Sequence, residues 1–271
     1  MSYQMILSDL DETLLVDMHV PQFNRDAITK AREKGVRFVV ATGRSDEMIA
    51  DILHEIGTYD MPGEYSICFN GGLVIENKNS KVLHFHGIDY EDAKFIYEEG
   101  IRRGLGIIIF TDECCYLINT DQSEIDRKVE QHATFKALVN PDISFLKGRK
   151  IAKAMLVKRD MEYLLKLREE IYPKVSDRME LSFSSNRYLE CNAKGIDKGY
   201  GLRWLADYLG IPVKDSIAVG DNYNDLAMIE EAGLGCCVLS AAKDIKKKAD
   251  YVCQNDYDQG AVKEVIEKFI L

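Results

Sequence analysis

Short apolar runs alternate with amphipathic stretches along the first third of the chain. Apolar, partly β-branched runs occur at 4–8, 36–40 and 65–69, which predicts buried strands. Residues 24–34 place apolar side chains at helical spacing, and a second such stretch follows Ser45, the expected N-cap of that helix. Strands that alternate with helices in this way predict a parallel sheet with right-handed crossovers.

The same rhythm returns at the C-terminal end. A helix is expected over 198–209, and a strand over 216–219 runs into Gly220. Further elements are expected at 224–232 (helix), 236–239 (apolar run), 244–248 (basic helix), 251–253 (short apolar run) and from about 259 (helix). We therefore expect both ends of the chain to build one doubly wound, mostly parallel, Rossmann-like α/β sheet.

The middle of the chain has a different pattern. Helices are expected over 90–103, 123–135 and 161–172, and strands over 105–110, 115–119, 152–157, 179–184 and 187–191. Adjacent hairpins favour an antiparallel sheet with helices on one face, an α+β unit. The predicted organisation is a discontinuous core, 1–83 and 190–271, with an inserted α+β domain at 84–189.

Length, charge and cysteine usage narrow the class of protein. The 271 residues suit one large domain or two ordinary ones. A net charge of −10 disfavours nucleic-acid and membrane-surface binding. No basic leader precedes a long apolar run near Met1, and no stretch approaches the ~18 apolar residues of a membrane span. Seven cysteines without a CxxC pair fit reduced thiols and a cytoplasmic protein, and zinc is disfavoured.

Polar residues that could take part in catalysis or ligand binding follow several of the predicted strands. Asp9 and Asp11 come directly after the first strand, Thr42 follows the second, and Asp221 follows the strand near the C-terminus. Lys198 opens a helix, an unfavourable place for a cation. Because the carboxyl ends of parallel strands share one edge of a sheet, these side chains are expected to converge.

Such a cluster has a limited chemical repertoire. Carboxylates that lie close together repel one another unless a cation joins them, and hard oxygen ligands favour Mg²⁺. The hydroxyl of Thr42 and the ammonium of Lys198 suit a dianionic phosphoryl group. An aspartate can attack phosphorus, and a second carboxylic acid beside it can protonate the leaving group and then activate water.

The order and spacing of these residues resemble the haloacid dehalogenase (HAD) superfamily, most closely its Cof-type sugar-phosphatase branch. In that branch a large α+β cap, of the C2B type, lies between the second and third motifs, where this chain has its insertion. The four matching motifs are Asp9-x-Asp11-x-Thr13, Thr42 in ATGR, Lys198-Gly199 and Gly220-Asp221-x-x-Asn224-Asp225.

The resemblance implies a division of roles. Asp9 would become an aspartyl phosphate, and Asp11 would act as general acid and then as general base. Mg²⁺ would be held by the carboxylates of Asp9 and Asp221 and by the main-chain carbonyl of Asp11. The phosphoryl oxygens would be held by Thr42, Lys198, Asn224 and backbone amides near Leu10 and Gly43. Thr13 and Asp225 would hold the binding residues or the metal-bound waters in place without binding the substrate directly. Arg44, Asn70 and Gly71 are candidate substrate contacts.

The expected function is Mg²⁺-dependent hydrolysis of small phosphate monoesters, such as sugar phosphates. A phosphotransferase or phosphomutase could use the same aspartyl phosphate, and a non-enzymatic phosphoacceptor switch is a further alternative. Relatives in the branch cleave sugar phosphates, pyridoxal phosphate or flavin mononucleotide, so the motifs leave the substrate and the oligomeric state open. Candidate specificity residues in the insertion are Tyr116, Ser184, Asn186 and Arg187.

Overall fold

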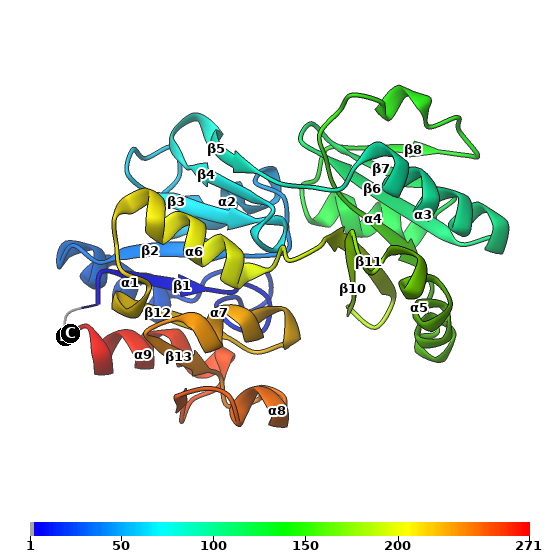
Figure 1. Cartoon of the computed structure of the whole chain (residues 1–271). Coiled ribbons are helices and arrows are strands. Elements are labelled where there is room, and N and C mark those ends of the chain that lie inside the picture. The colour runs from blue at the N-terminus through cyan, green and yellow to red at the C-terminus, as the bar shows by residue number, and fades with distance from the viewer. Residues whose placement is uncertain (1–2) are drawn as a thin grey trace. The chain divides into compact units, whose positions relative to one another are not determined.

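The computed structural model describes residues 3–271. Met1 and Ser2, which begin the N-terminal stretch where the sequence predicts no basic leader, lie outside the described residues. The chain forms two compact units (Figure 1). Unit 1 contains the chain up to His84 together with Asp197–Leu271, and unit 2 is Phe85–Ile196. The predicted boundary at 189/190 would have divided a strand, Tyr188–Ala193, that pairs with two strands of unit 2.

Unit 1 is built on an eight-stranded sheet with the order β14-β13-β12-β1-β2-β3-β4-β5. Pairing is parallel from β14 to β3, and β4 returns antiparallel to β3. The strands are β1 (Met5–Ser8), β2 (Arg37–Ala41), β3 (Tyr65–Cys68), β4 (Leu73–Glu76), β5 (Lys81–Phe85), β12 (Ser216–Gly220), β13 (Leu234–Cys237) and β14 (Tyr251–Val252).

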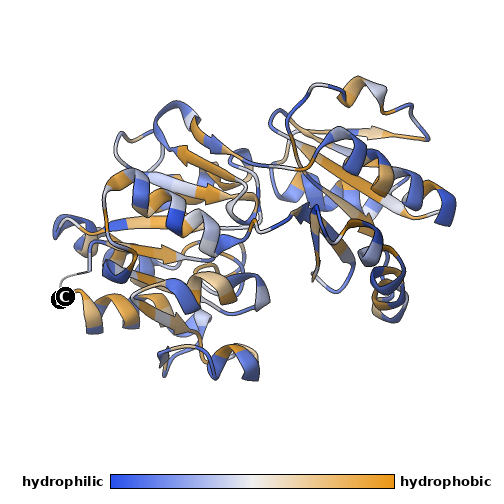
Figure 2. Cartoon of the chain, in the orientation of Figure 1, coloured by the Kyte–Doolittle hydropathy of each residue, from blue (hydrophilic) through white to orange (hydrophobic). Residues whose placement is uncertain are grey.

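Helices cover the sheet because its inner strands β1, β2, β3 and β12 are largely apolar (Figure 2) and buried at nearly every position. Met5 and Leu7 of β1 share a core with Leu202 of α6 and Met228 of α7. On the other side α1 contacts β2 and α9. The helices are α1 (Gln22–Glu33), α2 (Ala50–Glu55), α6 (Lys198–Leu209), α7 (Leu226–Glu231), α8 (Lys243–Lys246) and α9 (Ala261–Phe269). The doubly wound α/β core predicted from the sequence is confirmed.

The helix after β2 begins differently from the prediction. A 3-10 turn, Glu47–Ile49, precedes α2, and no side chain caps either element. The Ser45 hydroxyl is buried and has no hydrogen-bond partner among the described residues, so its predicted role as N-cap is wrong. The 3-10 turn moves the start of the α-helix to Ala50, out of reach of that hydroxyl.

Unit 2 contains a six-stranded sheet with the order β10-β11-β9-β6-β7-β8. All neighbouring pairs are antiparallel except β7 and β8, which are parallel. The elements are α3 (Tyr90–Arg103), β6 (Gly106–Thr111), β7 (Cys115–Ile118), α4 (Gln122–Glu130), β8 (Phe135–Leu138), β9 (Ile151–Val157), α5 (Met161–Val175), β10 (Met179–Ser184) and β11 (Tyr188–Ala193).

Two expectations for unit 2 are wrong. The helix predicted over 123–135 ends at Glu130, because His132 takes a positive φ and the amide of Ala133 returns to the Lys128 carbonyl. Phe135 then opens β8, so α4 is a crossover between parallel strands. Lys128 of α4 lies over Phe110, whereas Gly100 of α3 packs on Ile107, which points to the other face of β6. The helices therefore cover both faces of the sheet.

Two further features bear on the class of protein. No helix within residues 3–271 is long and apolar enough to cross a membrane. All seven cysteines are buried free thiols.

Candidate active site

Asp9 stands where β1 ends, at the carboxyl edge of the unit 1 sheet. Its backbone amide donates to the Val219 carbonyl of β12, so the chain is still held by the sheet at this residue. The side chain is buried, with the residue 6% exposed. The parallel pairing of β1 with β12 thus brings Asp9 beside the loop that carries Asp221.

Lys198, the first residue of α6, is completely buried between two carboxylates. Its Nζ lies 2.5 Å from Asp9 Oδ1 and 2.6 Å from Asp225 Oδ1. The other oxygen of Asp225 accepts the backbone amides of Asp221 and Asn222 at 3.0 and 3.1 Å. Both oxygens of Asp225 are therefore occupied, and this residue holds the lysine and the loop after β12 in place.

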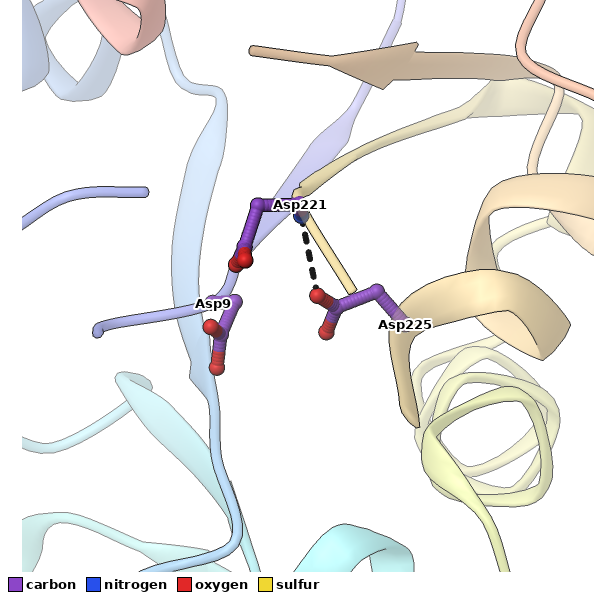
Figure 3. Close-up of side chains that lie close together, drawn as sticks. All are labelled: Asp9, Asp221 and Asp225. Carbon is purple, nitrogen blue, oxygen red and sulfur yellow. Dashed lines mark hydrogen bonds between the residues drawn. The ribbon is translucent and has the colours of Figure 1, made fainter. Parts of the chain in front are cut away.

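Asp221 completes a buried group of three carboxylates (Figure 3). Oxygens of Asp9, Asp221 and Asp225 all lie within 4.8 Å of one another. The Thr13 hydroxyl donates to Asp221 Oδ1 at 3.0 Å, which fixes the orientation of that carboxylate. One ammonium against three carboxylates leaves an excess of negative charge, which is the composition that a divalent cation would balance.

The electrostatics of the cluster reflect this excess. Burial, followed by repulsion from Asp225, raises the pKa of Asp9 to about 7, although Lys198 opposes the rise. Burial and repulsion from Asp225 and Asp9 raise the pKa of Asp221 to about 8. Burial disfavours the charged form of Lys198, but the two carboxylates outweigh it and raise the pKa of this lysine. Without a further cation, the cluster therefore retains protons near neutral pH.

Thr42 and Asn70 follow β2 and β3 and are joined to each other. The amide of Thr42 donates to the Ile67 carbonyl, and the amide of Asn70 donates to the Thr42 carbonyl, both at 2.9 Å. Asn70 has φ 53°, and its side-chain oxygen accepts the Asn224 amide at 3.4 Å. A Cβ at Gly43 would lie 3.1 Å from the same oxygen. The four residues thus form one wall of the site, drawn from three loops.

Two glycines are required by close backbone approaches beside the cluster. A Cβ on Gly71, which has φ 99°, would lie 2.1 Å from the carbonyl oxygen of Asp197, the N-cap of α6. A Cβ on Gly220 would lie 2.5 Å from the Cβ of Asp225. These glycines therefore allow the start of α6, with Lys198, and the Asp225 turn to reach the edge of the sheet.

The Asp11 carboxylate binds Arg44 and is not one of the three buried carboxylates. Arg44 Nη2 lies 2.5 Å from Asp11 Oδ1, and Nε donates to Oδ2 at 3.1 Å, so the contact is bidentate. The Arg44 side chain is 6% exposed, whereas that of Asp11 is 60% exposed. The resemblance implied a substrate contact at position 44; the structure shows a buried arginine that binds a carboxylate.

Most of the predicted residues fall into two groups. Asp9, Thr13, Lys198, Asp221 and Asp225 share the buried cluster, while Asn70 joins Thr42, Gly43 and Asn224 in the adjoining wall. Leu10 is buried, and its carbonyl accepts the amides of Thr13 and Leu14 in the turn that carries Asp11. The side chain of Asp11 is bound to Arg44. The motif pattern did not predict this ion pair.

Comparisons with known proteins agree with the fold and the motifs. Residues 6–266 match the family described as haloacid dehalogenase-like hydrolase. The chain is 28% identical to the Bacillus subtilis protein YxeH, covering 98% of each chain, and 25% identical to phosphatase YwpJ of the same organism, covering 95% and 96%. It superposes with TM-score 0.87 on a haloacid dehalogenase-like hydrolase from Bacteroides thetaiotaomicron, at 26% identity, covering 98% and 99%.

Proposed function

The chain belongs to the haloacid dehalogenase-like hydrolase family, and from this premise we propose that it is a Mg²⁺-dependent phosphatase of small phosphate monoesters. Relatives named as phosphatases over nearly the full length support a phosphoric monoester hydrolase. The observation that carries the proposal is Lys198, which is buried and bound to both Asp9 and Asp225 beside Asp221. We propose unit 1 as the catalytic core and unit 2 as the inserted cap.

The donor set of the cluster fits a magnesium ion. Asp9 and Asp221 would hold the ion through carboxylate oxygens, with the main-chain carbonyl of Asp11 as a third ligand. Both oxygens of Asp225 are engaged, one by Lys198 and the other by backbone amides. This supports a role in which Asp225 positions the metal ligands and does not bind the metal itself. When bound, Mg²⁺ would neutralise charge on the cluster and on the phosphoryl oxygens.

Asp9 would attack the phosphorus atom of the ester. A bond forms between its carboxylate oxygen and phosphorus, the bond from phosphorus to the ester oxygen breaks, and Asp11 gives a proton to the leaving alcohol. Asp11 then takes a proton from water, whose oxygen bonds to phosphorus as the Asp9 acyl phosphate breaks, releasing inorganic phosphate. Thr42, Lys198, Asn224 and backbone amides near Leu10 and Gly43 would hold the phosphoryl oxygens.

A panel of phosphate monoesters, sugar phosphates included, tests this function. We expect Mg²⁺-dependent release of inorganic phosphate in equal amount to the alcohol. An isomerised ester with little free phosphate would instead identify a phosphomutase. A protein that is phosphorylated on Asp9 but turns over no ester would identify a phosphoacceptor switch.

The raised pKa values of the cluster predict how pH affects stability. Because Asp9 and Asp221 titrate at about 7 and about 8, the folded metal-free protein binds protons that the unfolded chain has already released. This contribution to stability is complete below about pH 4 and is lost as pH rises toward about 8. We expect the Tm of the metal-free wild type, relative to an Asp221→Asn variant, to fall over this range. Mg²⁺ should raise the wild-type Tm most at high pH. Parallel Tm curves for the two proteins would contradict the raised pKa values.

Arg44 is expected to act by positioning Asp11. In an Arg44→Gln variant the Asp11 carboxylate loses its bidentate partner, so kcat should fall roughly 10- to 100-fold with little change in KM. Arg44→Lys should recover only part of kcat, because an ammonium cannot make both contacts.

Steady-state kinetics on one good substrate separate the two interpretations of this arginine. A rise in KM with kcat unchanged would make Arg44 a substrate contact instead. Arg32→Gln is a matched control, because Arg32 binds Glu64 through Nε and Nη2 elsewhere in unit 1. We expect its kinetics to match those of the wild type.

A further inference from the structure

Unit 2 buries three charged side chains between α4 and the sheet, those of Lys128, Lys153 and Glu190. Together with the ring of Phe110, we call them the lysine cluster. Lys128 and Lys153 are 4% and 3% exposed, and Glu190 is 7% exposed. Lysines are almost never buried to this degree unless a carboxylate neutralises them. We therefore ask whether each lysine of the cluster has a carboxylate partner within the described residues.

Only one of the two lysines has a carboxylate partner. Lys153 Nζ lies 2.7 Å from Glu190 Oε2, and the other oxygen of Glu190 accepts the Ser184 hydroxyl. Lys128 Nζ donates to the neutral amide oxygen of Gln131 at 2.8 Å. Within residues 3–271 no carboxylate lies in ion-pair range of Lys128. The cluster thus holds two ammonium groups against one carboxylate whose two oxygens are both engaged.

The two lysines are also close enough to repel each other. Their ammonium groups lie 5.3 and 5.4 Å from the centroid of the same Phe110 ring. Burial lowers the pKa of Lys128 to about 8, and the positive charges of Lys153 and Arg127 act in the same direction, whereas Cys115 and the Glu124 carboxylate oppose this fall. An aromatic face offsets part of this cost, but it supplies no formal negative charge.

Two arginines extend the positive charge next to the cluster. Arg127, beside Lys128 on α4, and Arg187, in the turn between β10 and β11, both have a buried Nε without a hydrogen-bond partner in the described part of the chain. Arg187 contacts Glu124 at 3.3 Å, and Glu124 also binds the Tyr188 hydroxyl. Among the described residues of this region, Lys153 pairs with Glu190 and Arg187 with Glu124, whereas Lys128 and Arg127 have no carboxylate partner, in a protein whose net charge is −10.

We propose that the lysine cluster is a binding site for an organic anion, a carboxylate or phosphate group of a small metabolite, with Lys128 as its principal donor. Such a group would supply the missing negative charge and accept hydrogen bonds from the remaining N–H groups of Lys128. The anion is either a second acidic group on the hydrolysed ester or a separate small molecule. The first case rests on the proposed phosphatase function, and the second does not.

The test uses the full-length protein and Lys128→Met, which keeps the volume of the side chain and removes its charge. The first arm compares kcat/KM for 3-phosphoglycerate and for glycerol 3-phosphate, which differ by a carboxylate. The second arm titrates malonate into the Asp9→Asn protein, with and without Lys128→Met, by calorimetry. Lys128→Arg serves as the conservative variant, Lys158→Met as a lysine control elsewhere in unit 2, and thermal unfolding verifies that each variant is folded.

Either arm can support the proposal. We expect Lys128→Met to lower the preference for 3-phosphoglycerate, or the affinity for malonate, roughly tenfold or more, with partial recovery in Lys128→Arg and no change in Lys158→Met. An effect in the first arm identifies the anion as part of the substrate, and an effect in the second arm alone identifies a separate ligand. If folded Lys128→Met matches the wild type in both arms, the proposal is overturned. Failure of the phosphatase function would abolish turnover of every ester and leave the malonate titration readable.

Discussion

Replacement of Asp9 by Asn is expected to abolish phosphatase turnover, lowering kcat by at least about 10³-fold. The amide cannot form the acyl phosphate, because it offers no anionic oxygen to attack phosphorus. The shape of the side chain is unchanged, and Asn removes one of the carboxylates that repel Asp221 and Asp225. The variant should therefore remain folded, which separates loss of chemistry from loss of structure.

Two measurements check this expectation. Phosphate release under saturating Mg²⁺ gives kcat, and mass spectrometry of acid-quenched protein reports whether Asp9 carries a phosphoryl group in the wild type. Asp250→Asn is the matched control, because Asp250 accepts the Gly235 amide at the far edge of the sheet and an Asn oxygen can do the same. Wild-type turnover in Asp9→Asn would remove this residue from the mechanism.

The sequence was sufficient to predict that Asp9, Lys198 and Asp221 lie close together, with Thr42 at the same edge of the sheet. Asp9, Thr42 and Asp221 each follow a buried apolar run, and the edge of a parallel sheet brings such positions together whatever the length of the chain between them. Lys198 could be added because a cation at the start of a helix is otherwise unfavourable there. Hydrophobic periodicity likewise predicted α3 and α6 with the bounds that the structure has.

Other features depend on conformations that residue types do not specify. ATGR identifies Arg44, but the ion pair with Asp11 depends on a turn in which Glu12 has a positive φ and on the rotamers of two long side chains. The end of α4 depends on a positive φ at His132, where a glycine would have been the usual signal. Because the sequence has no glycine there to signal the end of the helix, 123–135 was predicted as one helix. The strand β8 and the cover that α4 gives to the second face of the sheet were therefore not predicted.

Replacement of Lys198 by Met is expected to remove both activity and stability. The substitution leaves Asp9 and Asp225 buried without their shared cation, and breaking a buried ion pair in this way costs about 3–5 kcal/mol. Mg²⁺ should restore part of the stability, because it returns positive charge to the cluster. Urea unfolding with EDTA and with Mg²⁺ measures this free energy, and phosphate release measures activity. Lys214→Met, an exposed lysine of unit 1, is the control.

A double variant, Lys198→Met with Asp225→Asn, separates charge balance from catalysis. Removing the unpaired charge of Asp225 should recover much of the stability, since the Asn side chain can still accept a backbone amide of the Asp221–Asn222 turn. Activity should stay lost, because no ammonium remains to hold Asp9 and the phosphoryl oxygens. If activity returned together with stability, Lys198 would serve only to neutralise Asp225, and its proposed contact with the phosphoryl group would be wrong.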